Sequence, residues 1–246
     1  MLLRRLTTPV LEEHCYVLAS GHGSPALVID PGAATAPAVR DALAEQELSL
    51  GAVALTHGHA DHVWDAAGLA GSSPVYIGGP DAHRLDDPAS ALGVPLGEMF
   101  AAAAGTAWVR PARVEHWPGE VLAGEGAELV PGVVVRAVPA PGHTEGSTLL
   151  LVRGAIEDPD GALPASVAGE EDLLLALCGD VIFAGSIGRT DLPGGDEREM
   201  IATLRTLATS LPPSTVLLPG HGPATVLAHE ITGNAHVRAA MGRSGR

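Results

Sequence analysis

Lysine is absent from this chain of 246 residues, and its 14 basic residues are all arginine. They stand against 29 Asp and Glu residues, so the formal net charge is −15 when histidine is neutral. This excess of negative charge opposes binding to a nucleic-acid backbone or to an anionic membrane surface. We therefore expect a small-molecule substrate, with neither nucleic acid nor a membrane as partner. The sequence carries no signal for an oligomeric state.

Cysteine and long apolar runs are also scarce. The two cysteines, Cys15 and Cys178, lie far apart in the sequence, which favours reduced, buried thiols and a cytoplasmic location. No apolar stretch approaches the roughly 20 residues that cross a bilayer, and we expect no signal peptide. Hydrophobic residues still make up 46% of the chain, which is enough for a folded core.

Short apolar runs alternate with helical patterns along the chain, which predicts an α/β fold. Strands are expected at residues 15–19, 26–29, 52–55, 75–77, 133–138, 148–152, 173–177 and 216–218. A helix is predicted over residues 35–47 with Thr35 as its N-cap, and another up to about residue 71. A third begins after Asp196, with Glu199 placed as in a capping box and Ile201 on its apolar face. Residues 80–118 show no clear pattern and are interpreted as a flap or a variable insertion.

Potential metal ligands gather where the predicted strands end. The segment Thr56-His57-Gly58-His59-Ala60-Asp61-His62 places four ligand-type side chains within six positions, directly after an apolar strand. Alternate residues of an extended loop point the same way, so His57 and His59 can bind one ion. Asp61 and His62 begin the next helix and suit a second ion.

Three further candidates each follow a strand beside a glycine, which lets the chain turn without Cβ strain. They are His143, Asp180 and His221. A set of nitrogen and oxygen ligands without thiolate is typical of Zn²⁺, Fe²⁺ or Mn²⁺ sites. The pattern therefore predicts a divalent metal site built from loops at strand ends.

In these segments the chain resembles the metallo-β-lactamase-fold superfamily. Residues 183–195, Phe-Ala-Gly-Ser-Ile-Gly-Arg-Thr-Asp-Leu-Pro-Gly-Gly, resemble its hydroxyacylglutathione hydrolase (glyoxalase II)-like branch. The resemblance extends from about residue 10 to residue 235. It implies a four-layer αββα sandwich with the metals at one edge, and a single domain over residues 1–246 without the C-terminal helical domain that binds glutathione.

The resemblance also implies the ligand set and the reaction. The first ion would be held by His57, His59 and His143, the second by Asp61, His62 and His221, and Asp180 would bridge both. Two divalent ions, Zn²⁺ before Fe²⁺ or Mn²⁺, would share a water of lowered pKa, so that Asp61 and Asp180 act with a metal-bound hydroxide. The hypothesis is acyl thioester hydrolysis. Arg189 either binds a substrate carboxylate or pairs with Asp191. Since glyoxalase II grips glutathione with basic residues including Lys, the missing lysine argues against that carrier.

Three other functions compete with thioester hydrolysis. A persulfide dioxygenase would use one iron on His57, His143 and Asp180 and leave the second site empty. Another metallo-hydrolase, such as a lactonase or a β-lactamase, shares the site, although β-lactamases commonly place Cys where this chain has Asp180. A non-catalytic metal-binding protein would leave a complete ligand set unused.

Several residues are interpreted as structural. His22 is predicted in a hairpin turn, and Trp64 and Cys178 in the core. The remaining histidines are predicted at the surface, namely His14, His83, His116, His229 and His236.

Overall fold

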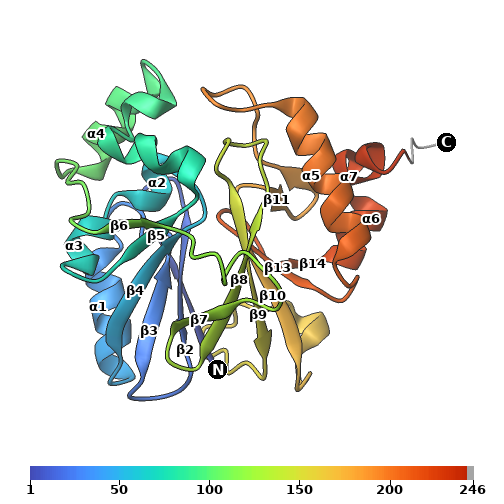
Figure 1. Cartoon of the computed structure of the whole chain (residues 1–246), viewed down its shortest axis with the longest axis horizontal. Helices are drawn as coiled ribbons and strands as arrows, with labels where there is room; N and C mark the ends of the chain where they lie inside the picture. Colours follow the sequence, from blue (N-terminus) through green and yellow to red (C-terminus); the bar gives the residue numbers. More distant parts are fainter. Residues whose placement is uncertain (243–246) are drawn as a thin grey trace.

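Two β-sheets pack face to face, and helices cover the outer face of each (Figure 1). The structure is a computed structural model that describes residues 1–242. The first sheet contains, in spatial order, β1 (Leu2–Thr7), β2 (His14–Ala19), β3 (Pro25–Ile29), β4 (Ser49–Leu55), β5 (Val75–Ile77) and β6 (Val114–His116). The second contains β14 (Thr225–Val226), β13 (Val216–Pro219), β10 (Leu173–Gly179), β9 (Thr148–Gly154), β8 (Val133–Pro139) and β7 (Ala127–Val130).

The helices fall into two groups, one for each sheet (Figure 1). Beside the first sheet lie α1 (Ala36–Glu45), α2 (Ala60–Val63), α3 (Ala66–Ala70), η1 (Gly79–Asp86), η2 (Ser90–Leu92) and α4 (Leu96–Ala104). Beside the second lie α5 (Glu197–Ser210), α6 (Leu227–Gly233) and α7 (Ala235–Ala240). A short hairpin of β11 (Ile182–Phe183) and β12 (Ser186–Ile187) and the turn η3 (Ala165–Val167) complete the fold. The predicted αββα sandwich is confirmed. The predicted domain 1–246 ends on residues 243–246, which lie outside the described residues.

The apolar residues fill the three interfaces between the four layers of the fold, and each interface forms one apolar layer. The central layer joins the inner faces of the two sheets, with Leu18 and Ile29 from the first and Leu150 and Leu175 from the second. A second layer packs the outer face of the first sheet against α1 to α3, and a third packs the second sheet against α5 to α7. Every predicted strand is present, because each supplies alternating or continuous apolar residues to these layers.

The site's position follows from strand direction. Strands β3, β4, β5 and β6 run parallel to one another, and β10 runs parallel to β13. Carboxyl ends of parallel strands meet at one edge of a sheet, so the segments after β4, β10 and β13 meet at one edge of the sandwich. A backbone hydrogen bond from Thr148 N to Thr56 O (2.8 Å) joins the two sheets there.

Local details differ from the sequence predictions where tertiary contacts replace the expected cap. Thr35 is at the N-cap of α1, but its hydroxyl donates to Gly32 O (2.5 Å), and Asp65 accepts from Ala36 N instead. Asp196 caps α5 as predicted. Its own N–H donates to Gly142 O, so Glu199 does not complete a capping box.

Two further predictions about helices are wrong in part. The single helix expected up to about residue 71 is two short ones, α2 and α3. Ile201, predicted on the apolar face of α5, is 39% exposed, while the buried face of that helix carries Met200 and Leu204. Residues 80–118, for which no elements were predicted, form η1, η2, α4 and β6, and their interpretation as a flap or a variable insertion stays a prediction.

Candidate metal centre

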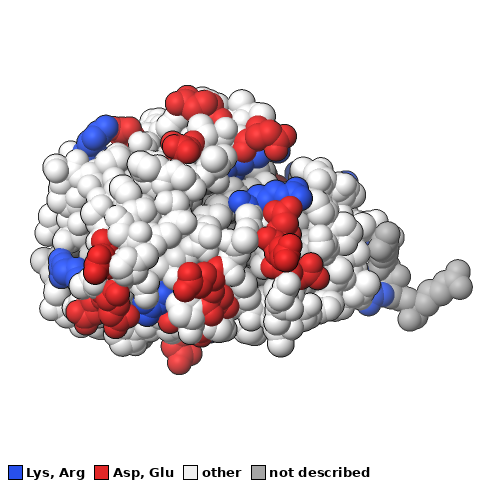
Figure 2. Space-filling view, turned by 90° about the horizontal axis from the view of Figure 1, so that it is seen from below, with Lys and Arg blue, Asp and Glu red and all other residues white. Residues whose placement is uncertain are grey.

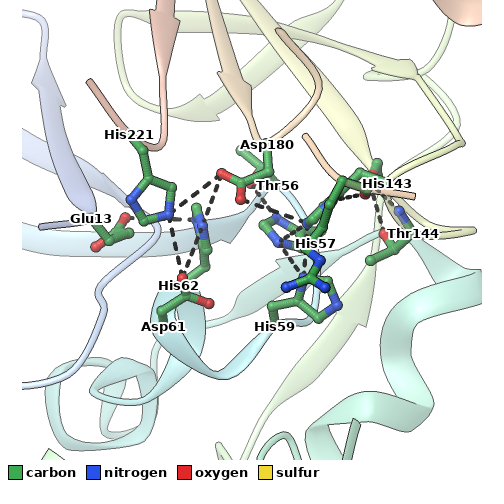
Figure 3. Close-up of polar contacts among 12 residues, drawn as sticks. Glu13, Thr56, His57, His59, Asp61, His62, His143, Thr144, Asp180 and His221 are labelled. Atoms are coloured by element: carbon green, nitrogen blue, oxygen red, sulfur yellow. Dashed lines mark hydrogen bonds and ion pairs between the residues drawn. The ribbon is translucent and has the colours of Figure 1, made fainter. Parts of the chain in front are cut away.

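Seven side chains predicted as ligands converge at the shared strand edge (Figure 3). We call them the histidine–aspartate cluster: His57, His59, Asp61, His62, His143, Asp180 and His221. They fall into two groups with Asp180 between them, one of three histidines and one of Asp61, His62 and His221 (Figure 3).

The first group is a triangle of ring nitrogens. His57 Nε2 lies 3.1 Å from His59 Nδ1, which lies 2.8 Å from His143 Nε2, and the third side measures 3.2 Å. All three residues are buried. Zinc–nitrogen bonds of about 2.0 Å fit a triangle of nitrogens close to this size.

The hydrogen positions in the triangle can be assigned from its outer partners. His143 Nδ1 lies 2.7 Å from Arg189 O, so it donates there and its Nε2 carries a bare lone pair. His57 Nδ1 lies 3.2 Å from the hydroxyl oxygen of Thr56. Because the Thr56 hydroxyl donates its own hydrogen to Asp30 (2.6 Å), His57 Nδ1 donates to Thr56, and its Nε2 also carries a bare lone pair. Lone pairs that face one another in a buried site call for a cation between them, and the three nitrogens fit that role.

Burial keeps His57 and His59 of this group neutral, as metal ligands must be. Desolvation lowers the pKa of His57 well below its usual value, and the neighbouring histidines lower it further. Desolvation, with the charge of His143, lowers the pKa of His59 to about 3. Neither ring therefore takes up a proton near neutral pH.

The second group pairs histidines with carboxylates. His62 Nε2 lies 3.2 Å from Asp180 Oδ1, and His221 Nε2 lies 3.3 Å from Asp61 Oδ2. The other oxygen of Asp180 faces the first group, with Oδ2 3.7 Å from His143 Nε2. Asp180 therefore lies between the two groups with one oxygen toward each, which is the geometry of a bridging ligand.

The electrostatics of the second group also suit a cation. His62 Nε2 and Asp180 Oδ1 are buried and have no hydrogen-bond partner within the described residues. Burial raises the pKa of Asp180, but the neighbouring histidines, His62 before His143 and His221, together outweigh this and the net shift is downward. The pKa of Asp61 is lowered in the same way. Two ionised carboxylates in a buried site require positive charge nearby.

Asp30 and Glu13 support the second group, and neither was predicted from the sequence. Asp30 Oδ2 lies 3.1 Å from His62 Nδ1, which therefore donates and leaves Nε2 free for a ligand. Asp30 also accepts from Thr56 N at 2.7 Å. Glu13 is fully buried, with Oε1 3.7 Å from His62 Nδ1. Burial raises the pKa of the Glu13 carboxyl well above its usual range. Asp30 is signalled in the sequence only as a carboxylate at the end of an apolar strand.

Asp81 joins the two loops that carry the histidine triangle. Its carboxylate accepts from Gly58 N (2.8 Å), from Gly146 N (2.8 Å) and from the hydroxyl of Thr144 (2.8 Å). The guanidinium of Arg84 lies beside it at 3.3 Å and also pairs with Glu145. Asp81 is fully buried and lies in η1, inside the region that had no predicted structure.

Arg189, predicted to hold a substrate carboxylate or to pair with Asp191, makes the ion pair. Nε lies 2.7 Å from one oxygen of Asp191 and an Nη lies 2.8 Å from the other. Its guanidinium is exposed, and the hydrogen bond to Asp191 raises its pKa by more than burial lowers it. Binding of a substrate carboxylate by Arg189 stays a prediction.

A cleft of about 510 Å³ opens onto the cluster, with Asp61, Asp180 and His221 at its base. Its sides are mostly apolar. We call these residues the apolar wall: Val10, Leu11, Leu96, Met99, Phe100 and Phe183.

The remaining residues singled out in the sequence mostly have structural surroundings. His22 lies in the turn between β2 and β3, as predicted. Trp64 and Cys178 are buried in the core, as predicted, and both cysteines are free thiols. The surface prediction for histidines is confirmed at His83, His116, His229 and His236.

His14 is the exception among the histidines predicted at the surface. It is buried, and its Nε2 lies 2.8 Å from Gly222 O in the loop after His221. Its Nδ1 lies 3.0 Å from the hydroxyl of Thr7. The surface prediction for His14 is therefore wrong, because strand pairing turns this side chain toward the loop that carries His221.

Similarity to known proteins identifies the family of this chain. Residues 8–157 match the family model of the Metallo-beta-lactamase superfamily. An uncharacterized protein of Mycobacterium tuberculosis is 32% identical over 232 residues, which is 94% of this chain and 95% of that protein. The hydroxyacylglutathione hydrolase GloC of Haemophilus influenzae is 29% identical over 215 residues, 85% of each chain. The crystal structure of TTHA1623 in a di-iron-bound form shares 30% identity and a TM-score of 0.66, covering 94% of this chain and 98% of that one. The protein therefore belongs to the metallo-beta-lactamase superfamily of metal-dependent hydrolases.

Proposed function

We propose that this hydrolase cleaves acyl thioesters, using two divalent ions in the histidine–aspartate cluster. The observation that carries the proposal is the position of Asp180, with one oxygen toward each ligand group, at the base of a cleft large enough for a small molecule. We propose Zn²⁺ as the metal, with Fe²⁺ and Mn²⁺ as the alternatives. The similarity to a protein named hydroxyacylglutathione hydrolase and to a di-iron-bound structure supports this choice.

The net reaction adds water across the bond between carbonyl carbon and sulfur. The carbon–sulfur bond breaks, the carbonyl carbon gains the water oxygen to give a carboxylic acid, and the sulfur leaves as a thiol with the remaining proton. Divalent ions bound here would supply Lewis-acid polarisation of the carbonyl and a water of lowered pKa.

The chain's own residues hold this arrangement in place. Arg189 O and Thr56 fix the ring orientation of His143 and His57, and Asp30 fixes that of His62. Asp61 and Asp180 stay ionised against the effect of burial because positive charge lies beside them, either that of protonated His62 or that of the ions that would replace its proton. Ligands held in one orientation before substrate arrives need no rearrangement during the reaction, which favours catalysis.

The rival dioxygenase would need one iron on His57, His143 and Asp180. The completeness of the second group, with His62 oriented by Asp30, favours two ions and hydrolysis instead. A lactonase would use the same cluster and differ only in the leaving oxygen, so substrate assays must separate it from a thioesterase.

A small-molecule substrate without nucleic acid also remains part of the proposal. The lower face of the molecule carries several patches of Asp and Glu with fewer basic side chains between them (Figure 2). Such a surface repels polyanions. No helix within residues 1–242 is long and apolar enough to cross a membrane.

The test is thiol release from metal-loaded protein with a panel that includes S-lactoylglutathione and simple acyl thioesters. We expect turnover that falls at least about a hundredfold in Asp180→Ala, because several kcal/mol of transition-state stabilisation depend on the metals. Asp172→Ala, an exposed carboxylate paired with Arg153, serves as the matched control and should keep full activity. Elemental analysis should find two ions per chain.

Turnover no greater than that of His57→Ala on every thioester would overturn the proposal. Oxygen uptake with glutathione persulfide, together with one iron per chain, would support the dioxygenase instead.

A further inference from the structure

The wall of the cleft is unusual for a surface that faces water. Leu11, Leu96 and Met99 are 61%, 41% and 65% exposed, yet all three line the cleft above the histidine–aspartate cluster. They account for three of the eight large hydrophobic side chains that are exposed within the described residues. Exposed apolar side chains that gather beside a reactive centre mark a binding surface.

Helix α4 supplies the largest part of this surface. Leu96, Met99, Phe100 and Ala103 recur at the spacing of one helical face, and all four line the cleft. Phe100 is anchored from behind by the ring of Trp64, with centroids 5.2 Å apart. The face is therefore held in place and presents apolar carbon to the cleft.

Positive charge for an anionic group is scarce in the same cleft. Apart from histidines of the cluster, the cation among its described lining residues is Arg189, which is already paired through Nε and one Nη with Asp191. Arg84 is buried behind Gly58 and is engaged by Asp81 and Glu145. Glutathione and coenzyme A carry carboxylates or phosphates, which bind best to free guanidinium or ammonium groups.

We propose that the cleft binds an apolar acyl chain, so that the substrates are thioesters of aliphatic or aromatic acids rather than of lactate. The inference rests on the proposed thioesterase function and adds the substrate class. The scissile carbonyl lies at the cluster, and the chain attached to it runs along the apolar wall. The thiol carrier projects toward solvent, where its charges stay hydrated.

The first experiment varies the acyl chain on one neutral carrier. Acetyl, butyryl, hexanoyl and octanoyl thioesters of N-acetylcysteamine are compared on metal-loaded protein. We expect kcat/KM to rise about threefold to fourfold for each methylene buried against the wall, until the cleft is filled. In a second arm the hexanoyl chain is kept and the carrier is changed to glutathione or coenzyme A, which should alter kcat/KM less than the chain does.

The second experiment changes the wall. Met99→Ser and Leu96→Ser replace exposed side chains, so both variants should fold and bind metal as the wild type does. We expect each to lower kcat/KM for the octanoyl thioester about tenfold while changing the acetyl thioester less than twofold. Ile201→Ser is the matched control, because Ile201 is an exposed apolar residue on α5 outside this cleft.

A binding readout is independent of turnover. Octanoate should raise the thermal midpoint of the protein more than acetate does, and Met99→Ser should remove the difference. The inference is overturned if acetyl and octanoyl thioesters react equally, if the carrier matters more than the chain, or if the wall variants behave as Ile201→Ser does. Absence of hydrolysis for every thioester would instead overturn the proposed function.

Discussion

The histidine–aspartate cluster and the apolar wall face the same cleft but are built in opposite ways. The cluster is buried and polar, and its side chains are oriented by hydrogen bonds that they donate to distant parts of the chain, such as His62 to Asp30 and His143 to Arg189 O. The wall is apolar and largely exposed, and α4 at its centre is a helix of nine residues. The contrast indicates that the reaction depends on a rigid polar frame, by which we mean the cluster and the residues that orient it. The choice of substrate depends on a surface that tolerates change.

The largest effect should come from breaking the frame at Asp81. Asp81→Asn removes the charge that accepts from Gly58 N and Gly146 N and that faces Arg84. Because a buried guanidinium loses one of its two carboxylate partners and the buried N–H groups lose a charged acceptor, we expect the free energy of unfolding to fall by about 3 kcal/mol. Metal affinity should fall roughly tenfold to a hundredfold, since the residue orients ligands without touching the ion.

Urea unfolding and metal titration measure both effects. The control is Asp86→Asn on the same 3₁₀ segment, where the exposed carboxylate pairs with the exposed Arg110. It should change stability by less than about 0.5 kcal/mol. Equal stability of the two variants would show that Asp81 does not tie the histidine loops together.

A smaller effect should come from one added methyl group at Gly220. A Cβ there would lie 2.6 Å from Asp180 Oδ1 and would also meet the ring of His62. Overpacking of this kind costs roughly 1–3 kcal/mol, and here it displaces His62 and the Asp180 oxygen that faces the second group. We expect Gly220→Ala to bind one ion where the wild type binds two, measured by elemental analysis and calorimetric titration.

Gly68→Ala provides the comparison for this change. Gly68 lies in α3 with open space around the position of a Cβ, so its replacement should leave metal content unchanged and stability equal or slightly higher. Two ions in Gly220→Ala would contradict the assignment of His62 and Asp180 to a shared site.

The frame was largely predictable from the sequence, because its ligands lie at the ends of strands whose apolar runs are clear. His57 and His143 are far apart in the chain, yet each follows such a run, and parallel strand ends meet at one edge. The partners behind these ligands were not predictable. Glu13 and Asp81 become meaningful only when the fold places them against His62 and Gly58, and no local pattern encodes those contacts.

The wall shows the opposite limit. The Ala, Pro and Gly content of residues 80–118 hides their elements from sequence patterns. Yet Leu96, Met99, Phe100 and Ala103 follow helical spacing, so the helix itself was open to prediction. What could not be predicted is that this face turns toward a cleft instead of the core, since only the packing of Trp64 behind Phe100 decides that.

The smallest effect concerns pH and separates the frame from the wall by titration. Burial lowers the pKa of His14, which holds Gly222 O beside His221. The unfolded chain therefore binds a proton at this ring below about pH 6.5 that the folded chain resists, and stability falls as the pH drops through that value toward the lower folded pKa.

His14→Gln lacks this titrating ring. Its stability relative to the wild type should therefore improve between pH 7.5 and pH 5.5, measured by urea unfolding in the presence of a chelator so that metal release is common to both. Met99→Ser changes a wall residue with no titrating group, so its difference from the wild type should stay constant over the same range. A constant difference for His14→Gln as well would mean that this ring is as freely protonated in the fold as in the unfolded chain, and that the polar frame does not extend to β2.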